Sequence, residues 1–173
     1  GAVFVDDDEF ADVMRSLRIH GKGSDKYENV RIGLNARLDT IQAAILLEKL
    51  AIFPNEIEAR NKVADKYSDA LKDIFEVPYV LEDTISVWAQ YTLKASADKR
   101  GEIMKGLKEA GITSVVYYPT PLHLQTAYKH YPILPQGLPK SEKLSKQVFS
   151  LPMHPYLSEK DQDVIIKQLQ KHC

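Results

Sequence analysis

Cysteine is nearly absent from this sequence, with a single residue at position 173 of a 173-residue chain. One cysteine can form neither an intrachain disulfide nor a cysteine-based zinc site. We interpret Cys173 as a frayed residue at the chain end. A chain without a disulfide framework suits a reducing compartment, and no signal peptide is recognisable at its start, so the sequence predicts a cytoplasmic protein.

Long apolar runs and an excess of one charge are also lacking. The longest apolar-rich stretch, residues 41–53, is interrupted by Gln42, Glu48 and Lys49, and a membrane helix needs roughly 20 apolar residues. The formal net charge is −1 and the basic residues are scattered, without the basic stripe that binds nucleic acid. The sequence therefore predicts neither a membrane span nor a nucleic-acid partner.

Self-contained catalytic and metal motifs are missing as well. The sequence has no HExxH, GxSxG or GxGxxG, and none of its five histidines is paired four residues from another, so we predict no metal site. Residues 21–24 (GKGS) lack the spacing of a Walker phosphate loop. We interpret the acidic run at 6–9 as a helix start, because acidic residues favour the positive end of a helix.

The first part of the chain shows the patterns of a strand followed by helices. Residues 2–5 form an apolar run typical of a buried strand. Because such a strand needs neighbours, we expect the chain to be a piece of a longer protein. A helix follows over 10–17, and a long, largely buried helix begins near Leu38. Pro54 should kink that helix or split it in two.

From about residue 76 onward the pattern predicts a compact α+β unit. Alternating apolar residues mark strands, and stretches with helical periodicity mark the elements between them. Ser158 and the residues after it form a capping box for the last helix. The expected elements are strands at 87–94 and 114–118, and helices at 103–110, 125–131, 139–149 and from 158 onward.

A polar loop leads into the long helix and carries Asn35 and Arg37. Amide and guanidinium donors beside a helix start suit a bound phosphate or carboxylate, because backbone N–H groups and the helix dipole add to them. The alternative interpretation is structural. In it, Asn35 caps the helix and Arg37 pairs with Asp39.

Two further polar clusters stand out near proline residues. Residues 117–123 end in His123 at the end of an expected strand, a common place for ligand-binding groups; the alternative is an aromatic patch with an exposed histidine. In residues 150–156, two prolines would fix the directions of His154 and Tyr156. The alternative for this second cluster is a rigid connector.

Taken together, these segments resemble the DegT/DnrJ/EryC1/StrS family of PLP-dependent sugar aminotransferases. The order of the blocks matches along essentially the whole chain, and the block around residues 35–44 is the most specific. Residues 89–92 and 151–157 look closest to enzymes that act on 3-keto UDP-sugars, although enzymes for 4-keto sugars share most blocks. The resemblance is carried by residues 1–4, 18–21, 32–39, 42–44, 118–119, 121–123 and 150–154.

The resemblance implies an α/β fold class, the C-terminal part of a type I PLP-dependent aminotransferase. Residues 1–75 would be the end of the large PLP-binding domain with long connecting helices, and residues 76–173 the small α+β domain. The family works as a homodimer with shared active sites, and a cytoplasmic role in polysaccharide biosynthesis is expected. Asn35 would contact the PLP phosphate of the partner subunit. Arg37, His123, His154 and Tyr156 would contact the nucleotide-sugar substrate.

The resemblance also implies what this chain lacks. In the family, the lysine that binds PLP covalently lies before the position that matches Gly1, so we assign no catalytic residue and expect the chain alone to be inactive. The parent would transfer an amino group, from glutamate in the usual case, to a keto nucleotide sugar. Two alternatives stay open: a PLP-dependent sugar dehydratase, in which histidine replaces that lysine, and a non-catalytic dimerisation module.

Overall fold

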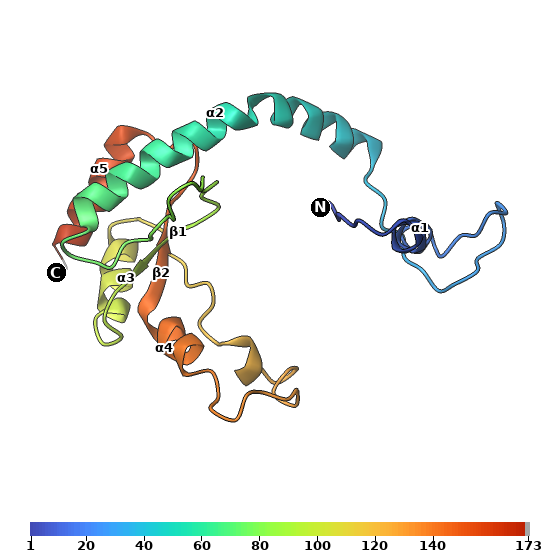
Figure 1. Ribbon diagram of the computed structural model, residues 1–173. Helices are drawn as coiled ribbons and strands as arrows, with labels where there is room; N and C mark the ends of the chain where they lie inside the picture. Colours follow the sequence, from blue (N-terminus) through green and yellow to red (C-terminus); the bar gives the residue numbers. More distant parts are fainter. Residues whose placement is uncertain (172–173) are drawn as a thin grey trace. The chain divides into compact units, whose positions relative to one another are not determined.

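The computed structural model describes residues 1–171, so the expectation for Cys173 lies outside the described residues. The chain divides into two compact units, Gly1–Ile52 and Phe53–Cys173. A single helix, α2 (Thr40–Leu71), includes residues of both units (Figure 1). Within the described part of the chain, no helix is long and apolar enough to span a membrane.

The first unit contains helix α1 (Asp8–Leu17), which begins as the acidic run predicts. The Asp7 side chain caps it by accepting a hydrogen bond from the Phe10 amide at 2.7 Å. The strand expected at residues 2–5 is wrong. These residues form no strand, and Phe4 is 91% exposed. A strand needs hydrogen-bonding neighbours, and within residues 1–171 no strand pairs with this segment.

Helix α2 differs from its expectation in two ways. It runs through Pro54 as one helix, so of the two effects expected of Pro54 the split is wrong and the kink stays a prediction. A proline removes one backbone hydrogen bond, and the turns on both sides can continue the helix. Its first half, expected to be buried, is exposed, with Ile41 at 75% and Leu47 at 68%. None of the described residues covers that face. The second half is the part that packs, through Tyr67 and Leu71 among others.

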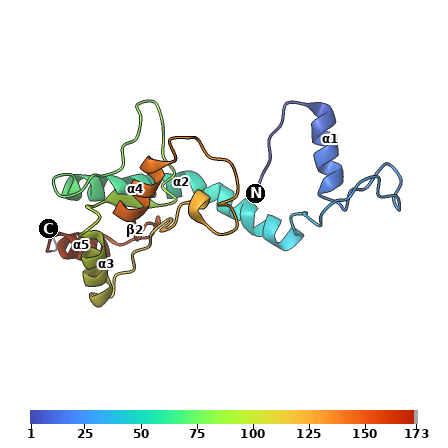
Figure 2. The same cartoon turned by 90° about the horizontal axis from the view of Figure 1, so that it is seen from below.

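The second unit is built around a two-stranded antiparallel sheet. Strand β1 (Tyr91–Lys94) pairs with β2 (Val148–Leu151). Helices α3 (Arg100–Glu109) and α5 (Glu159–Gln170) pack against one another, and α3 also contacts β2 (Figure 2). The core consists of Val63, Ala64, Tyr67, Leu71, Phe75, Trp88, Tyr91, Leu93, Ala95, Ile103, Leu107, Ile112, Phe149, Leu151, Ile165, Ile166 and Leu169.

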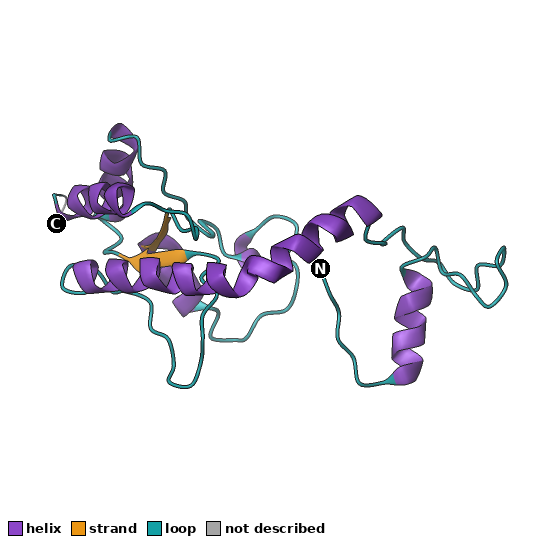
Figure 3. Cartoon of the chain, turned by 90° about the horizontal axis from the view of Figure 1, so that it is seen from above, coloured by secondary structure: helices purple, strands orange, loops and turns teal. Residues whose placement is uncertain are grey.

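The helix starts and stops of the second unit follow the sequence better than its strands do. The Ser158 hydroxyl accepts a hydrogen bond from the Asp161 amide at 3.1 Å, which confirms the predicted cap of α5. Gly111, with φ of 76°, follows the end of α3, as expected for a glycine after a helix. Both features depend only on neighbouring residues. Figure 3 shows that helices and loops dominate, with one small sheet.

The expected strands and the expected helix at 139–149 need correction. The first strand begins only at Tyr91, because Trp88 has φ of 46°, which extended backbone cannot adopt. Residues 114–118 form a single bridge, Val115 to Ser150, in place of a strand. Helix α4 (Pro139–Gln147) ends early, and β2 begins at the next residue. Phe149 of β2 packs into the core, with its ring centroid 5.9 Å from that of Phe75.

The helix expected at residues 125–131 is also wrong. A one-turn 3₁₀ helix, η1 (Leu122–Leu124), forms just before it. Turns follow over residues 125–131. Tyr128 and Tyr131 therefore lie on turns, where their rings are not tied to a helical face.

Candidate functional site

The loop that carries Asn35 is fastened to the segment after α1. The His20 amide donates to the Leu34 carbonyl at 2.9 Å, and the Ala36 amide donates to the Arg18 carbonyl at 3.0 Å. Between these two bonds, Asn35 lies opposite Ile19 in an antiparallel bridge. Backbone bonds on both sides fix the position from which the Asn35 side chain projects.

Two glycines allow this close approach of chain segments. A Cβ atom at Gly33 would lie 2.0 Å from the backbone nitrogen of Gly21, a distance that real atoms do not tolerate. Gly21 itself has φ of 75°, and a Cβ there would lie 1.8 Å from the Arg31 carbonyl oxygen. Only glycine fits either position without a shift of the backbone. The loop geometry around Asn35 is therefore encoded locally.

Asn35 and Arg37 are exposed, and the structural alternative for them is wrong. The cap of α2 is Asp39, whose Oδ1 accepts from the Gln42 amide at 3.0 Å. Within residues 1–171, neither the Asn35 amide nor the Arg37 guanidinium has a hydrogen-bond or ion-pair partner. Two unused donor groups on a fixed loop fit a phosphate or carboxylate ligand.

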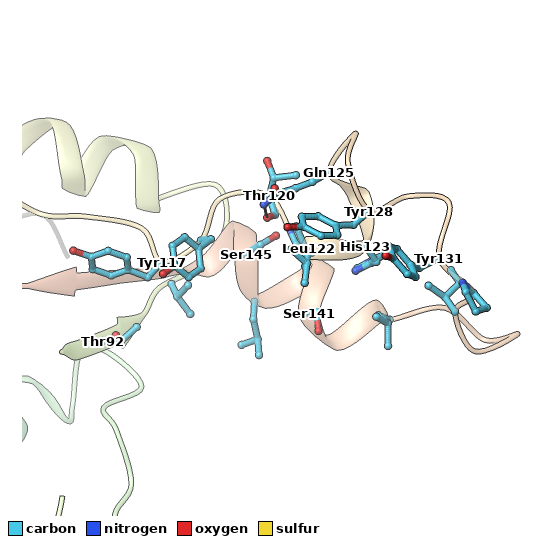
Figure 4. Close-up of a pocket in the computed structure, with 17 residues that line it drawn as sticks. Thr92, Tyr117, Thr120, Leu122, His123, Gln125, Tyr128, Tyr131, Ser141 and Ser145 are labelled. Carbon is cyan, nitrogen blue, oxygen red and sulfur yellow. Dashed lines mark hydrogen bonds between the residues drawn. The ribbon is translucent and has the colours of Figure 1, made fainter. Parts of the chain in front are cut away.

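His123 lies at a cavity of about 1020 Å³ in the second unit (Figure 4). Its Nε2 is 3.2 Å from Oε1 of Glu142, which belongs to the first turn of α4. The pair is partly buried, and the His123 side chain is only 10% exposed. The cavity is lined by Thr92, Tyr117, Tyr118, Thr120, Pro121, Leu122, His123, Gln125, Tyr128, Tyr131, Pro132, Ile133, Leu138, Ser141, Leu144, Ser145 and Val148.

This aromatic pocket, as we call the cavity, contains residues that the sequence analysis did not single out. Tyr128 and Tyr131 lie with ring centroids 6.4 Å apart. Figure 4 shows Tyr128, His123 and Tyr131 near one another, and Tyr117 toward the sheet. The sequence interpretation placed both tyrosines in a short helix at 125–131 and gave neither of them a role in a site. His123 is therefore not the solvent-exposed histidine of the alternative interpretation.

His154 and Tyr156 share one loop, and α2 holds that loop. The Tyr67 hydroxyl donates to the Pro152 carbonyl at 3.1 Å. The Tyr156 hydroxyl donates to Oε1 of Glu56 at 2.5 Å, and Glu56 is only 9% exposed. The loop is thus tied to α2 near both of its ends. The rigid-connector interpretation describes part of this arrangement, since the anchors hold the loop.

The same loop determines which nitrogen of His154 can donate. The Tyr156 amide lies 3.2 Å from Nδ1 of His154 and donates to it. A ring nitrogen that accepts carries no proton, so in the neutral ring Nε2 is the donor. His154 is exposed, and its Nε2–H is available to a ligand oxygen.

The five predicted site residues thus fall into three places. Asn35 and Arg37 share a loop of the first unit, His123 lines the aromatic pocket, and His154 and Tyr156 share a loop of the second unit. Glu56, which holds Tyr156, gave no signal in the sequence, since it is one of several acidic residues on α2. Within residues 1–171, no group of three or more His, Cys, Asp or Glu could hold a metal ion.

A family model described as the DegT/DnrJ/EryC1/StrS aminotransferase family matches residues 1–170. The chain belongs to this family. Because the match extends over both units and all the blocks that carried the resemblance, the predicted fold class, the C-terminal part of a PLP-dependent aminotransferase fold, is confirmed.

Known members of the family are closely similar to this chain. It is 45% identical over 158 residues to the UDP-2-acetamido-2-deoxy-3-oxo-D-glucuronate aminotransferase of Pseudomonas aeruginosa, covering 91% of the chain and 42% of that protein. A DegT DnrJ EryC1 StrS aminotransferase from Brucella abortus is 54% identical with a TM-score of 0.92, covering 97% and 44% of the two chains.

A further solved structure, DesV from S. venezuelae, is 32% identical with a TM-score of 0.86, covering 95% and 44% of the two chains. The chain thus spans less than half the length of these family members.

Proposed function

We propose that the complete protein containing this chain transfers an amino group from glutamate to a keto nucleotide sugar, and that the sugar is a 3-keto UDP-sugar. The observation that carries the proposal is the pair of unpartnered donors, Asn35 and Arg37, on a fixed loop in a chain of this aminotransferase family. The similarity to the Pseudomonas aeruginosa enzyme supports the choice of a 3-keto UDP-sugar.

The proposed cofactor is PLP, since the family is PLP-dependent and a related structure from Streptococcus pneumoniae is known in its PLP form. When bound, PLP acts as the electron sink that makes amino transfer possible. Asn35 fits this group through its free amide, which would donate to the phosphate. Arg37 would hold a carboxylate or phosphate of the substrate with its fork of N–H donors.

We assign both donors to the active site of a partner subunit in a homodimer. A fixed loop with outward-facing donors suits a ligand held by another chain. His123, His154 and Tyr156 would contact the nucleotide sugar, with His154 donating from Nε2. Residues 1–75 would complete the large domain and residues 76–173 form the small one. We also propose a cytoplasmic location and a role in polysaccharide biosynthesis.

The test is an assay of the complete protein with PLP, glutamate and keto-sugars. Mass spectrometry of the product with 3-keto and 4-keto UDP-sugars should show an amino group only, or faster, with the 3-keto compound. Asn35→Ala should weaken PLP retention, and Arg37→Ala should raise KM. Arg31→Ala, on the same loop, is the matched control and should change neither. Full activity of both variants would contradict the assigned roles.

The same assay separates the alternatives. A dehydratase would give a product without the added nitrogen, and we expect no such product.

The exposed apolar face of α2, with Ile41 and Leu47, favours self-association as a second role. Sedimentation of the isolated chain at several concentrations tests it, because a clean monomer at high concentration would contradict it. We also expect no amino transfer by the isolated chain, since none of its lysines matches the family's PLP lysine.

A further inference from the structure

Apart from His123, no acidic or basic side chain lines the aromatic pocket. None of its 17 lining residues is Lys, Arg, Asp or Glu. A diphosphate carries negative charge and is normally held by guanidinium, ammonium or clustered N–H donors. The pocket is therefore unsuited to the diphosphate of a nucleotide sugar, and it suits an uncharged part of such a molecule.

Its walls offer exposed aromatic rings, and His130 packs on Tyr131 with ring centroids 4.6 Å apart. Tyr131 is 61% exposed, Tyr128 43% and Tyr117 42%. Tyrosine rings stack on flat, uncharged rings, and every nucleobase has such a face whatever substituents the ring carries. The volume of about 1020 Å³ lies at the upper end of the usual range for small-ligand sites, so a nucleoside fits easily.

Polar groups at the wall could read the edge of a base. A carboxylate only accepts hydrogen bonds, so the contact with Glu142 places the His123 proton on Nε2 and leaves Nδ1 as an acceptor in the neutral ring. Gln125 donates its amide to the Thr120 carbonyl at 3.3 Å, which keeps its Oε1 as a further acceptor. Acceptors of this kind match the ring N–H of a pyrimidine such as uracil or thymine.

We propose that the aromatic pocket binds the pyrimidine nucleoside end of a nucleotide sugar, while the diphosphate lies outside it. This inference rests on the proposed function and adds a place for one part of the substrate. Tyr128 and Tyr131 stack on the base, and His123, held by Glu142, positions its edge. The pocket thus recognises the nucleotide and leaves the sugar to other residues.

The test measures binding of uridine, UDP and inorganic pyrophosphate to the complete protein by isothermal titration calorimetry. Uridine and UDP should bind, and pyrophosphate should not compete with uridine. Tyr128→Leu and Tyr131→Leu should each weaken uridine binding about tenfold, the usual effect of losing a stacking partner. Tyr128→Phe and Tyr131→Phe keep the ring and should bind within about twofold of the unchanged protein. Tyr79→Leu, exposed and outside the pocket, is the matched control.

The outcomes separate this proposal from the proposed function. Amino transfer to a UDP-sugar with an unchanged KM in both leucine variants would overturn the pocket assignment and leave the function standing. Uridine binding that needs Tyr128 and Tyr131, in a protein that performs no amino transfer, would support the pocket and overturn the function. If the leucine variants alter the oligomeric state in sedimentation while uridine binding is unchanged, the pocket is a protein contact and the proposal fails.

Discussion

The phenol of Tyr156 donates a hydrogen bond to Oε1 of Glu56 across 2.5 Å, although the two residues are 100 positions apart in the chain. Glu56 is 9% exposed, and a buried carboxylate needs hydrogen-bond donors. The contact fastens the His154 loop to α2. It gives Tyr156 a structural role in addition to the substrate contact proposed for it.

Removing the Tyr156 hydroxyl should therefore destabilise the second unit. We expect Tyr156→Phe to lower the free energy of unfolding by about 1–2 kcal/mol, because a buried oxygen loses a donor. Urea unfolding measures this, with Tyr79→Phe as the exposed control. In combination with Glu56→Gln the losses should be less than additive, since both changes affect one bond. Strict additivity would contradict the direct contact.

Two buried tyrosines predict a stability that falls at alkaline pH. Burial raises the pKa of Tyr67 well above its usual value of 10.0. Burial also raises the pKa of Tyr91, and the hydrogen bond with Ser68 opposes that rise. In the unfolded chain both phenols lose their protons near pH 10, whereas the folded chain retains them. The stabilising contribution is thus complete below pH 10 and is lost as the pH rises further.

Urea midpoints measured from pH 8 to 11.5 test this sign, with both pH limits set roughly around the phenol range. We expect a plateau and then a decline, and Tyr67→Phe should make the decline shallower. Absorbance of tyrosinate at the same pH values should show Tyr67 and Tyr91 losing their protons only as the chain unfolds. A midpoint that increases above pH 10 would contradict the prediction.

The loop that presents Asn35 depends on Gly33. We expect Gly33→Ala to disrupt it, because the added Cβ would lie 2.0 Å from the backbone nitrogen of Gly21. Hydrogen exchange should show faster exchange of the His20 and Ala36 amides, which close the loop. Gly101→Ala is the control, as nothing lies within 4 Å of its added Cβ. It should stabilise α3 by about 0.5 kcal/mol, since alanine favours helix over glycine. Unchanged exchange in Gly33→Ala would show that the loop adapts.

Asn61 holds Trp88, the chain's one tryptophan. Removing the Asn61 side chain should therefore change the fluorescence of Trp88. Its Oδ1 accepts from Nε1 of Trp88 at 3.0 Å, and its Nδ2 donates to the carbonyls of Ile57 at 2.8 Å and Ser86 at 3.1 Å. We expect Asn61→Ala to cost about 2 kcal/mol and to shift the emission of Trp88 to the red. Asn55→Ala, exposed on the same helix, should do neither. An unshifted spectrum would mean that Trp88 is held by packing alone.

Local chemistry made the helix ends predictable. Asp7, Asp39 and Ser158 each accept from an amide within three residues, and such contacts depend on neighbouring residues only. The resemblance in the block around Asn35 likewise pointed to the family. Gly33 explains part of that block, since its neighbours leave no space for a side chain.

Contacts between distant segments were not predictable from a single sequence. Val148 and Phe149 belong to the helix expected at 139–149, and only pairing with β1 makes them part of a strand. The Glu56 to Tyr156 bond spans most of the second unit, and nothing near Glu56 in the sequence announces it. Tyr128 and Tyr131 fall in the helix expected at 125–131, although the prolines near them favour turns.

Helix α4 ends at Gln147 and β2 begins at Val148, so no linker residues separate the helix from the strand. The pairing of Leu151 with Tyr91 sets how far α4 can rotate or slide. The position of Glu142 relative to the sheet is consequently fixed, and through Glu142 so is the position of His123. One extra residue inserted after Gln147 would turn α4 by about a quarter of a revolution and separate Glu142 from His123.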